Sequence, residues 1–167
     1  MIFLTVGSEL PFDRLVRAVD DWAGRHGDTE IFGQLCEPGE TGHRPKNFEW
    51  TARLDPPEFR RRVAEASHLV GHAGMGTIID ALTQCKPLLM MPRRAHLRET
   101  RNDHQVATVE RFGTRPGLHG AMDLDEVDAG MTRLLADTTV LAPLAPHAED
   151  RRIAFLNGAI QGPGPSC

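Results

Sequence analysis

The chain has 167 residues, a length that suits one domain with one hydrophobic core. Hydrophobic residues make up 40% of the sequence and charged residues 25%, an ordinary composition for a soluble globular protein. The formal net charge of -4 argues against a general nucleic-acid-binding protein, which would usually be basic overall.

Neither the cysteines nor the N-terminal segment is typical of a secreted or membrane-spanning protein. Cys36, Cys85 and Cys167 form no CxxC pair, so they predict neither a zinc site nor a disulfide framework. The apolar run at residues 2–6 has no basic region before it, and Glu9 follows closely, which excludes a signal peptide. No stretch approaches the ~20 apolar residues that a membrane-spanning helix needs. We therefore expect a cytoplasmic protein whose membrane association is peripheral or through a partner.

The first third of the chain alternates apolar runs with a segment of helical spacing. Residues 2–6 are apolar and closed by Gly7, which predicts a buried first strand. Residues 30–35 and, more weakly, 48–52 predict the second and third strands. Between the first two strands a helix is predicted, with Pro11 in its first turn. Its apolar positions are Phe12, Leu15, Val16, Val19, Trp22 and Ala23.

The middle of the chain continues the same alternation. Asp55 is a capping residue, with a proline after it and Glu58 three positions on, which predicts a helix that runs to Ala66. Residues 67–70 and 87–91 are predicted to be strands. The segment between them is predicted to be a loop and then a helix, over residues 74–83.

The last third is predicted to be helical. Residues 103–112 form one predicted helix, and residues 123–136 another. A final helix at residues 148–160 either docks a partner or packs within the chain, and the proline-containing segment after it predicts a disordered tail at residues 162–167. In the second of these helices, Leu124, Val127, Met131, Leu134 and Leu135 share one face, and in the final one Ile153, Leu156 and Ile160 do.

The order of these elements predicts an α/β fold. Strands that alternate with helices favour a single Rossmann-like domain, with a mainly parallel sheet flanked by helices. This domain is expected to cover residues 1–161.

The most informative segment is residues 72–82, which read HAGMGTIIDAL. A strand ends there in a glycine-rich turn, and a helix begins directly after it. Free backbone N–H groups and the positive end of the helix dipole then point at one spot. Glycines also remove the side chains that would keep a pyrophosphate at a distance. Because GxG is a weak motif, a tight strand–helix turn without a ligand explains these glycines equally well.

Several motifs in a fixed order are more specific than this one. TVGS at residues 5–8, HAGMGT at 72–77, KPLLMMP at 86–92 and NDHQ at 102–105 follow one another along the chain. In this order they resemble the C-terminal domain of GT-B glycosyltransferases, in particular the family-28 type that includes MurG. Within that type the chain is most similar to single-domain members. These are the PssE-type subunits of bacterial exopolysaccharide assembly and the cytosolic subunit of the dolichol-pathway N-acetylglucosamine transferase.

The resemblance implies a UDP-sugar site. It extends well over residues 1–112 and loosely over the rest. The first turn and the glycine-rich loop look like two backbone cradles for the donor diphosphate, and residues 54–56 resemble a loop whose backbone pairs with uracil. The implied UDP-sugar-binding residues are Gly7, Ser8, His72, Ala73, Gly74, Met75, Gly76, Thr77, Asp80, His104 and Gln105.

Side-chain roles in this site have simpler alternatives. Asp80 holds the position of a carboxylate, often Glu in the family, that grips the ribose hydroxyls, and we favour this role over a helix-surface aspartate or a local helix-stabilising charge. Gln105 and His104 match a motif that touches the donor sugar or its phosphates, and a glutamine offers both donor and acceptor atoms. His72 either bonds a phosphate oxygen or is a satisfied histidine at a strand end. For Asp103 we favour an N-cap.

An arginine-rich segment precedes this motif, with Arg93, Arg94, Arg98 and Arg101. It could attract the pyrophosphate of a lipid-linked acceptor or anionic headgroups. A solvated loop is the interpretation that we favour.

The resemblance also implies half of an enzyme. A GT-B enzyme holds its donor in one Rossmann-like domain and its acceptor in another, and this chain has elements for one only, with the donor signature beginning at Thr5. We expect a membrane-associated, PssD-like partner to supply the acceptor domain, the lipid-linked saccharide acceptor and the general base, so no catalytic residue is assigned here. Preorganised N–H groups and helix dipoles stabilise the leaving diphosphate without a metal, so no cofactor is expected. An inverting outcome is implied.

Three other functions were weighed. A non-catalytic, nucleotide-sugar-binding or stabilising subunit would leave its partner active alone. A nicotinamide-dependent oxidoreductase would need GxGxxG after the first strand, where VGSELP stands at residues 6–11. A nucleotide-sugar epimerase of the same fold would carry two domains in one chain. The sugar stays open among glucose, galactose, N-acetylglucosamine and glucuronic acid.

Overall fold

A computed structural model of the chain describes residues 1–142. Its centre is one six-stranded sheet in the order β3-β2-β1-β4-β5-β6, and every pair of neighbouring strands is parallel. This confirms the predicted α/β fold with a mainly parallel sheet. The strands are β1 (Ile2–Thr5), β2 (Ile31–Gln34), β3 (Glu49–Thr51), β4 (His68–His72), β5 (Leu88–Met91) and β6 (Leu118–Gly120).

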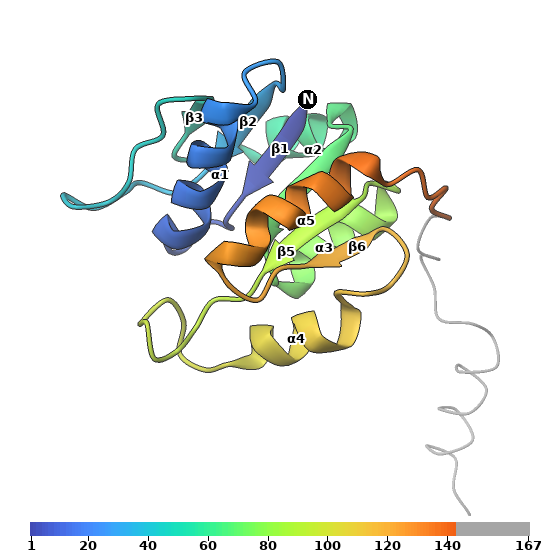
Figure 1. The fold of residues 1–167 in the computed structure, drawn as a ribbon. Coiled ribbons are helices and arrows are strands. Elements are labelled where there is room, and N and C mark those ends of the chain that lie inside the picture. The colour runs from blue at the N-terminus through green and yellow to red at the C-terminus, as the bar shows by residue number, and fades with distance from the viewer. Residues whose placement is uncertain (143–167) are drawn as a thin grey trace, which may run out of the picture.

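Helices cover both faces of the sheet (Figure 1). The first and last helices pack against each other on one face, and the other three lie on the opposite face. This is the expected arrangement for a parallel sheet, whose crossover connections place helices over its faces. The helices are α1 (Asp13–Arg25), α2 (Pro56–Glu65), α3 (Met75–Thr83), α4 (His104–Phe112) and α5 (Leu124–Ala136).

The apolar side chains of the strands contribute to two hydrophobic cores, one on each face of the sheet. Leu4 of β1 packs with the face that α1 and α5 cover, whereas its neighbour Phe3 packs with α2 and α3. Leu89 and Leu88 of β5 divide between the two faces in the same way. Strands that are buried on both faces read as continuous apolar runs, which is why β1 and β5 were predictable from the sequence.

One local prediction was wrong at a helix start, and another was confirmed in position only. Pro11 does not lie in the first turn of α1, because Phe12 has a non-helical φ of -137° and the helix begins at Asp13. Asp103 holds the N-cap position of α4, but its carboxylate accepts a hydrogen bond from the Ala95 amide instead of capping the helix. By contrast, Asp55 caps α2 as predicted and accepts a hydrogen bond from the Glu58 amide.

Further differences concern extent. Strand β6 was missed because it has only three residues, of which one is buried. On α5, Leu124 and Leu135 are 48% and 40% exposed, so the buried stripe is narrower than predicted and consists of Val127, Met131 and Leu134. The predicted final helix and tail, at residues 148–160 and 162–167, lie outside the described residues. Over residues 1–142, none of the helices combines the length and the apolar character needed to cross a bilayer.

Candidate functional site

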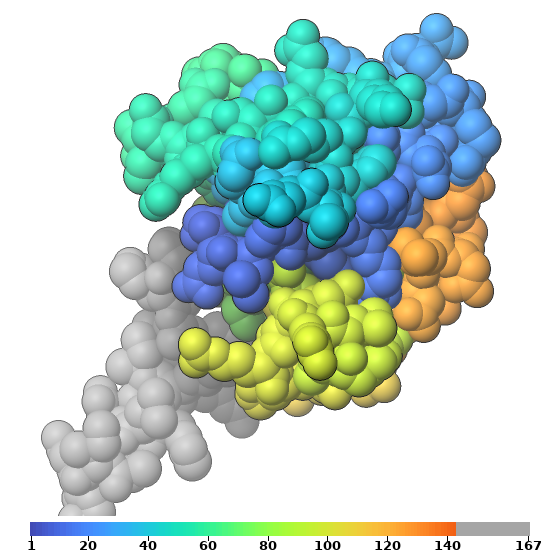
Figure 2. Space-filling view, turned by 90° about the vertical axis from the view of Figure 1, so that its left-hand side faces the viewer, coloured from blue at the N-terminus to red at the C-terminus, as the bar shows by residue number. Residues whose placement is uncertain are grey.

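The candidate site lies where the direction of chain progression reverses in the sheet. After β1 the chain moves to β2 on one side, and after β4 it moves to β5 on the other, so the neighbouring pair β1–β4 marks the switch point. Ligands of open α/β sheets bind outside the carboxyl ends of the strands at such a point. Figure 2 shows the loops that follow β1, β2 and β5 gathered on this face.

A cavity of about 890 Å³ opens at this edge. Thr5 at the end of β1 and His72 at the end of β4 both line it, so it straddles the switch point. Its volume is in the range of small-molecule and cofactor sites. The lining residues are Thr5, Gly7, Ser8, Gln34, Arg53, Leu54, Asp55, Pro56, Phe59, Arg60, His72, Gly76, Thr77 and Asp80.

The N-terminus of α3 supplies backbone donors to this cavity. Gly74 is the N-cap, and no side chain caps the helix, so its first amides have no carbonyl partner within it. The helix begins directly at Met75, which shortens the predicted loop and places Gly76 in the first helical turn. The positive end of the helix dipole and unpaired amides therefore meet beside the cavity, an arrangement that favours anions.

Gly76 has no role in packing that the described residues reveal. A Cβ placed on Gly76 would meet nothing within 4 Å, and the residue is helical, a conformation in which alanine is favoured over glycine by about 1 kcal/mol. A bare Cα at this position leaves room for the close approach of a ligand. Of the two explanations for the glycine-rich turn, this geometry favours the ligand.

The ring of His72 lies between the two glycine turns. A Cβ on Gly74 would collide with Nε2 of His72, and one on Gly7, whose φ is +87°, would lie 3.2 Å from Cε1. Burial, and then the positive charge of Arg93, lower the pKa of His72 to about 4. The imidazole is therefore neutral at pH 7, and it faces the cavity as a hydrogen-bonding group.

Asp80 lies one turn farther along α3, at the rim of the cavity. Its side chain is exposed, and partial burial raises its pKa. Within residues 1–142, no side chain or amide forms a hydrogen bond or ion pair with this carboxylate. Its oxygens are therefore open to hydroxyl donors from a ligand.

Gln34 is a site residue that the sequence reasoning missed. Its amide group, 5% exposed, donates from Nε2 to the Gly7 carbonyl at 3.2 Å and accepts from the Leu54 amide at 3.1 Å. It thus joins the first glycine turn to the 54–56 segment across the floor of the cavity. The Leu54 amide is engaged by this bond, so pairing with a base edge has to use other atoms of that segment. A glutamine inside an apolar strand was the available signal.

A smaller cavity of about 280 Å³ adjoins the first one and shares Gly7, Ser8 and His72 with it. Gln105 lines this second cavity, and its Oε1 accepts from the Arg93 amide at 3.1 Å. The rest of the lining is Val6, Glu9, Leu10, Arg93, Glu99 and Thr100.

The predicted site residues therefore divide into three groups. Seven line the two cavities: Gly7, Ser8, His72, Gly76, Thr77, Asp80 and Gln105. Ala73, Gly74 and Met75 build the turn without lining either cavity, and the Ala73 amide donates to the Met91 carbonyl. His104 is exposed and lines neither. In the described part of the chain, no three His, Cys, Asp or Glu side chains group as metal ligands would.

The arginine-rich segment does not behave as one cluster. Arg93 is 5% exposed and donates to backbone carbonyls of the β1–α1 turn, so a solvated role does not fit it. Arg94 is half-buried and donates to the Met122 carbonyl. Arg98 and Arg101 are exposed, as a solvated loop predicts. The favoured interpretation was therefore wrong for Arg93, because its guanidinium is needed inside the fold.

Known proteins share both sequence and fold with this chain. The UDP-N-acetylglucosamine transferase subunit ALG13 of Eremothecium gossypii is 38% identical over 82 residues, which are 48% of this chain and 37% of that protein. Two solved structures share the fold. The crystal structure of the glycotransferase of kitacinnamycin has a TM-score of 0.63 at 20% identity, covering 83% of this chain and 36% of that one. The solution structure of ALG13 has a TM-score of 0.59 at 17% identity, covering 93% of both chains.

These similarities are unequal in extent. The chain spans little more than a third of the length of the Eremothecium subunit and of the kitacinnamycin enzyme. They agree with the predicted C-terminal half of a GT-B fold. Residues 1–154 match the glycosyltransferase family 28 C-terminal domain, and the chain therefore belongs to this family.

Proposed function

We propose that this chain is the donor-binding subunit of a UDP-sugar hexosyltransferase. In this account it transfers a sugar to a lipid-linked acceptor in polysaccharide biosynthesis, such as exopolysaccharide assembly. A separate, membrane-associated subunit of the PssD-like type binds the acceptor and holds this chain at the cytoplasmic side of the membrane. Family membership and the similarity to a protein named as a transferase subunit support the proposal.

The observation that carries the proposal is the cavity at the β1–β4 switch point. The uncapped N-terminus of α3 and the bare Cα of Gly76 both open into it. A nucleoside diphosphate fits this arrangement, because backbone amides at a helix N-terminus bind phosphate oxygens. The Asp80 carboxylate lies about one helical turn away, where it would accept hydrogen bonds from the ribose hydroxyls.

The reaction needs stabilisation of a leaving group. The acceptor oxygen bonds to the anomeric carbon, the bond from that carbon to the β-phosphate oxygen breaks, and its electron pair leaves with UDP. Amides and a helix dipole that are already oriented stabilise this charge without reorganising. The acceptor proton passes to a base on the partner, since no group of this chain is assigned that role.

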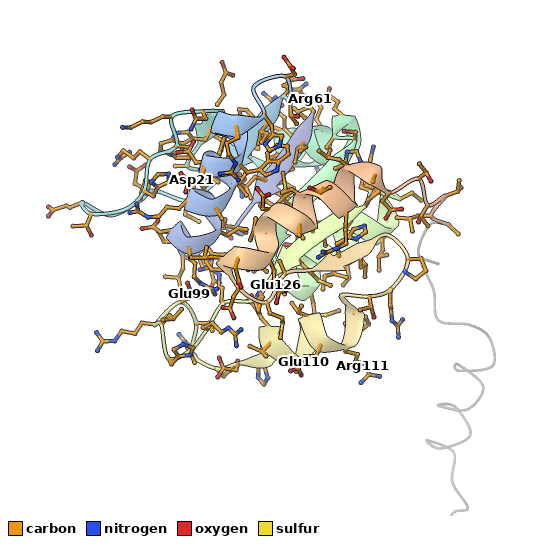
Figure 3. The ribbon with its side chains drawn as sticks, in the orientation of Figure 1. Asp21, Arg61, Glu99, Glu110, Arg111 and Glu126 are labelled. Atoms are coloured by element: carbon orange, nitrogen blue, oxygen red, sulfur yellow. The ribbon has the colours of Figure 1, made fainter. Side chains whose placement is uncertain are left out.

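Calorimetric titration with UDP, UDP-sugars and NAD tests the binding part of the proposal. We expect UDP to bind and NAD not to bind. Asp80→Asn should weaken UDP binding by about 1 to 3 kcal/mol, because hydrogen bonds to a charged acceptor are lost. Glu110→Gln is the matched control, since Glu110 lies on α4 away from the two cavities (Figure 3).

Two results would count against the proposal. NAD binding without UDP binding would remove the donor-binding function, and equal UDP affinities for wild type and Asp80→Asn would remove the ribose role of Asp80. Activity assays address the subunit role. A partner that transfers sugar at full rate alone would favour a non-catalytic, stabilising subunit.

A further inference from the structure

Buried side chains donate hydrogen bonds to carbonyl groups of the β1–α1 turn. The guanidinium of Arg93 donates to the Val6 carbonyl at 2.8 Å, to Leu10 at 2.6 Å and to Pro11 at 2.7 Å. Gln34 holds one of the three carbonyls between Val6 and Leu10, that of Gly7, at 3.2 Å. Most carbonyls between β1 and α1 are thus bound on the inner side of the turn.

This pattern determines where the amides of the turn are free to point. The carbonyl and the N–H of one peptide unit point in opposite directions, so holding the Val6 and Gly7 carbonyls on the inner side directs the Gly7 and Ser8 amides outward, where successive amides can bind an anion. Gly7 permits the required backbone, with a φ of +87° that other residues rarely adopt. Gly7, Ser8 and Glu9 line the smaller cavity, so this turn borders the site, and the Gly7 amide makes a long hydrogen bond of 3.4 Å to Oγ1 of Thr5.

Only arginine has the geometry for this task. Four hydrogen bonds occupy the two Nη atoms of Arg93, the fourth running to the Glu99 carbonyl at 3.4 Å. The guanidinium also lies 4.6 Å from the centre of the Phe12 ring. A lysine ammonium is a point charge with three donors on a flexible stem, and it cannot span the same set of carbonyls.

Arg93 also ties the turn to the opposite wall of the smaller cavity. Its amide donates to Oε1 of Gln105 at 3.1 Å, which fixes that side chain at the start of α4. The Glu99 carboxylate, which lies beside the start of α1 in Figure 3, accepts from Nε and Nη2 of Arg14 at 2.9 and 2.8 Å and from the Arg94 amide. The β5–α4 loop and the β1–α1 turn therefore form one connected wall.

We propose that Arg93 is a positioning residue that shapes the β1–α1 turn to receive the diphosphate, without donating its Nη hydrogen bonds to the ligand. This inference rests on the proposed function. It follows that loss of Arg93 weakens binding of the phosphate part of the ligand and leaves binding of the nucleoside part unchanged. The base and ribose contact the 54–56 segment and α3, which Arg93 does not touch.

The test compares UDP with uridine in NMR titrations of wild type, Arg93→Lys and Arg93→Gln. Both variants should bind UDP about tenfold or more weakly, the equivalent of one or two lost charge-assisted hydrogen bonds, and uridine as wild type does. Arg111→Gln on α4 removes the same charge from a site-distant position and should change neither affinity (Figure 3).

Each outcome separates the inference from the proposed function. Wild-type protein that binds neither ligand contradicts the proposed function. If wild type binds UDP and Arg93→Lys binds it equally well, Arg93 acts as a simple charge and the positioning role is overturned. If both variants fail to fold, the inference is tested by NMR titration of the wild-type protein alone. UDP, and not uridine, should shift the Gly7 and Ser8 amide signals while the Nη protons of Arg93 stay protected, and unshifted turn amides would overturn the inference.

Discussion

At the scale of single residues, both backbone dipoles and side chains favour the binding of an anion at the candidate site. His72 is neutral at pH 7, because burial and the nearby Arg93 charge lower its pKa to about 4. Its neutral ring has one N–H donor, one acceptor nitrogen and no positive charge. The Nη donors of Arg93 are engaged with carbonyls. The positive potential at this point therefore comes from the charge of Arg93 as well as from backbone amides and the dipole of α3, and Arg53 and Arg60 also line the larger cavity.

The lowered pKa of His72 predicts a specific dependence of stability on pH. Between pH 6.5 and about 4, the unfolded chain binds a proton at His72 that the folded chain does not, so the free energy of unfolding falls as pH falls through this window. The full contribution is present above pH 6.5, and the loss amounts to about 3 kcal/mol at most. His72→Asn should lack this loss in urea denaturation at pH 7 and pH 4.5. Parallel stability profiles for the two proteins would contradict it.

Residue contacts across long sequence separations were the ones that sequence reasoning could not supply. Arg93 and the Val6 carbonyl are 87 positions apart, and Gln34 and the Leu54 amide are 20 apart. Asp20 is a further case, because it accepts from the Lys46 and Asn47 amides and from Nε2 of His43. The role of each of these side chains can be recognised only when the fold has placed its hydrogen-bond partner beside it.

At the scale of elements, predictions based on local spacing succeeded. The cap on α2 was predictable because Asp55 and Glu58 are three residues apart, and the bond between them forms within one turn. The start of α1 was mispredicted because a non-local contact intervenes, in which the Pro11 carbonyl is bound by Arg93. Strand β6 carries too few apolar residues for a periodicity to be recognised.

The first turn of α3 gives the sharpest prediction at this scale. Gly76→Ala should stabilise the protein by roughly 0.5 to 1 kcal/mol, because alanine is favoured in a helix and the new Cβ meets no atom within 4 Å. The same methyl group should weaken UDP binding, because Gly76 lines the cavity in which we propose that the diphosphate binds. Thermal denaturation and calorimetry measure the two effects on one protein.

The matched control for this change is Gly27→Ala. Gly27 also has nothing within 4 Å of an added Cβ, and it lies outside both cavities. It should leave UDP affinity unchanged. If Gly76→Ala bound UDP as tightly as Gly27→Ala does, the bare Cα at position 76 would have no part in ligand binding.

At the scale of the whole molecule, the sheet order explains why the separate motifs form one site. The motifs at residues 5–8, 72–77 and 102–105 follow β1, β4 and β5, which are adjacent strands, so their carboxyl ends meet at one edge. The location of the candidate site could therefore be predicted from the order of the motifs in the sequence. Which residues of the motifs face the cavity could not be predicted, as His104 and Ala73 illustrate.

The proposed second subunit belongs to this scale. The candidate cavity opens at one edge of the single sheet that residues 1–142 form. In our account the acceptor approaches from outside this edge, held by the partner. The chain's own part is to bind UDP and to stabilise it as it leaves.

The most direct test of this account is a crystal structure of the protein with UDP. We predict that the diphosphate lies against the amides that begin α3 and those of Gly7 and Ser8, with the ribose hydroxyls within hydrogen-bond reach of Asp80. An empty cavity at saturating UDP, or nucleotide density elsewhere on the molecule, would contradict the account.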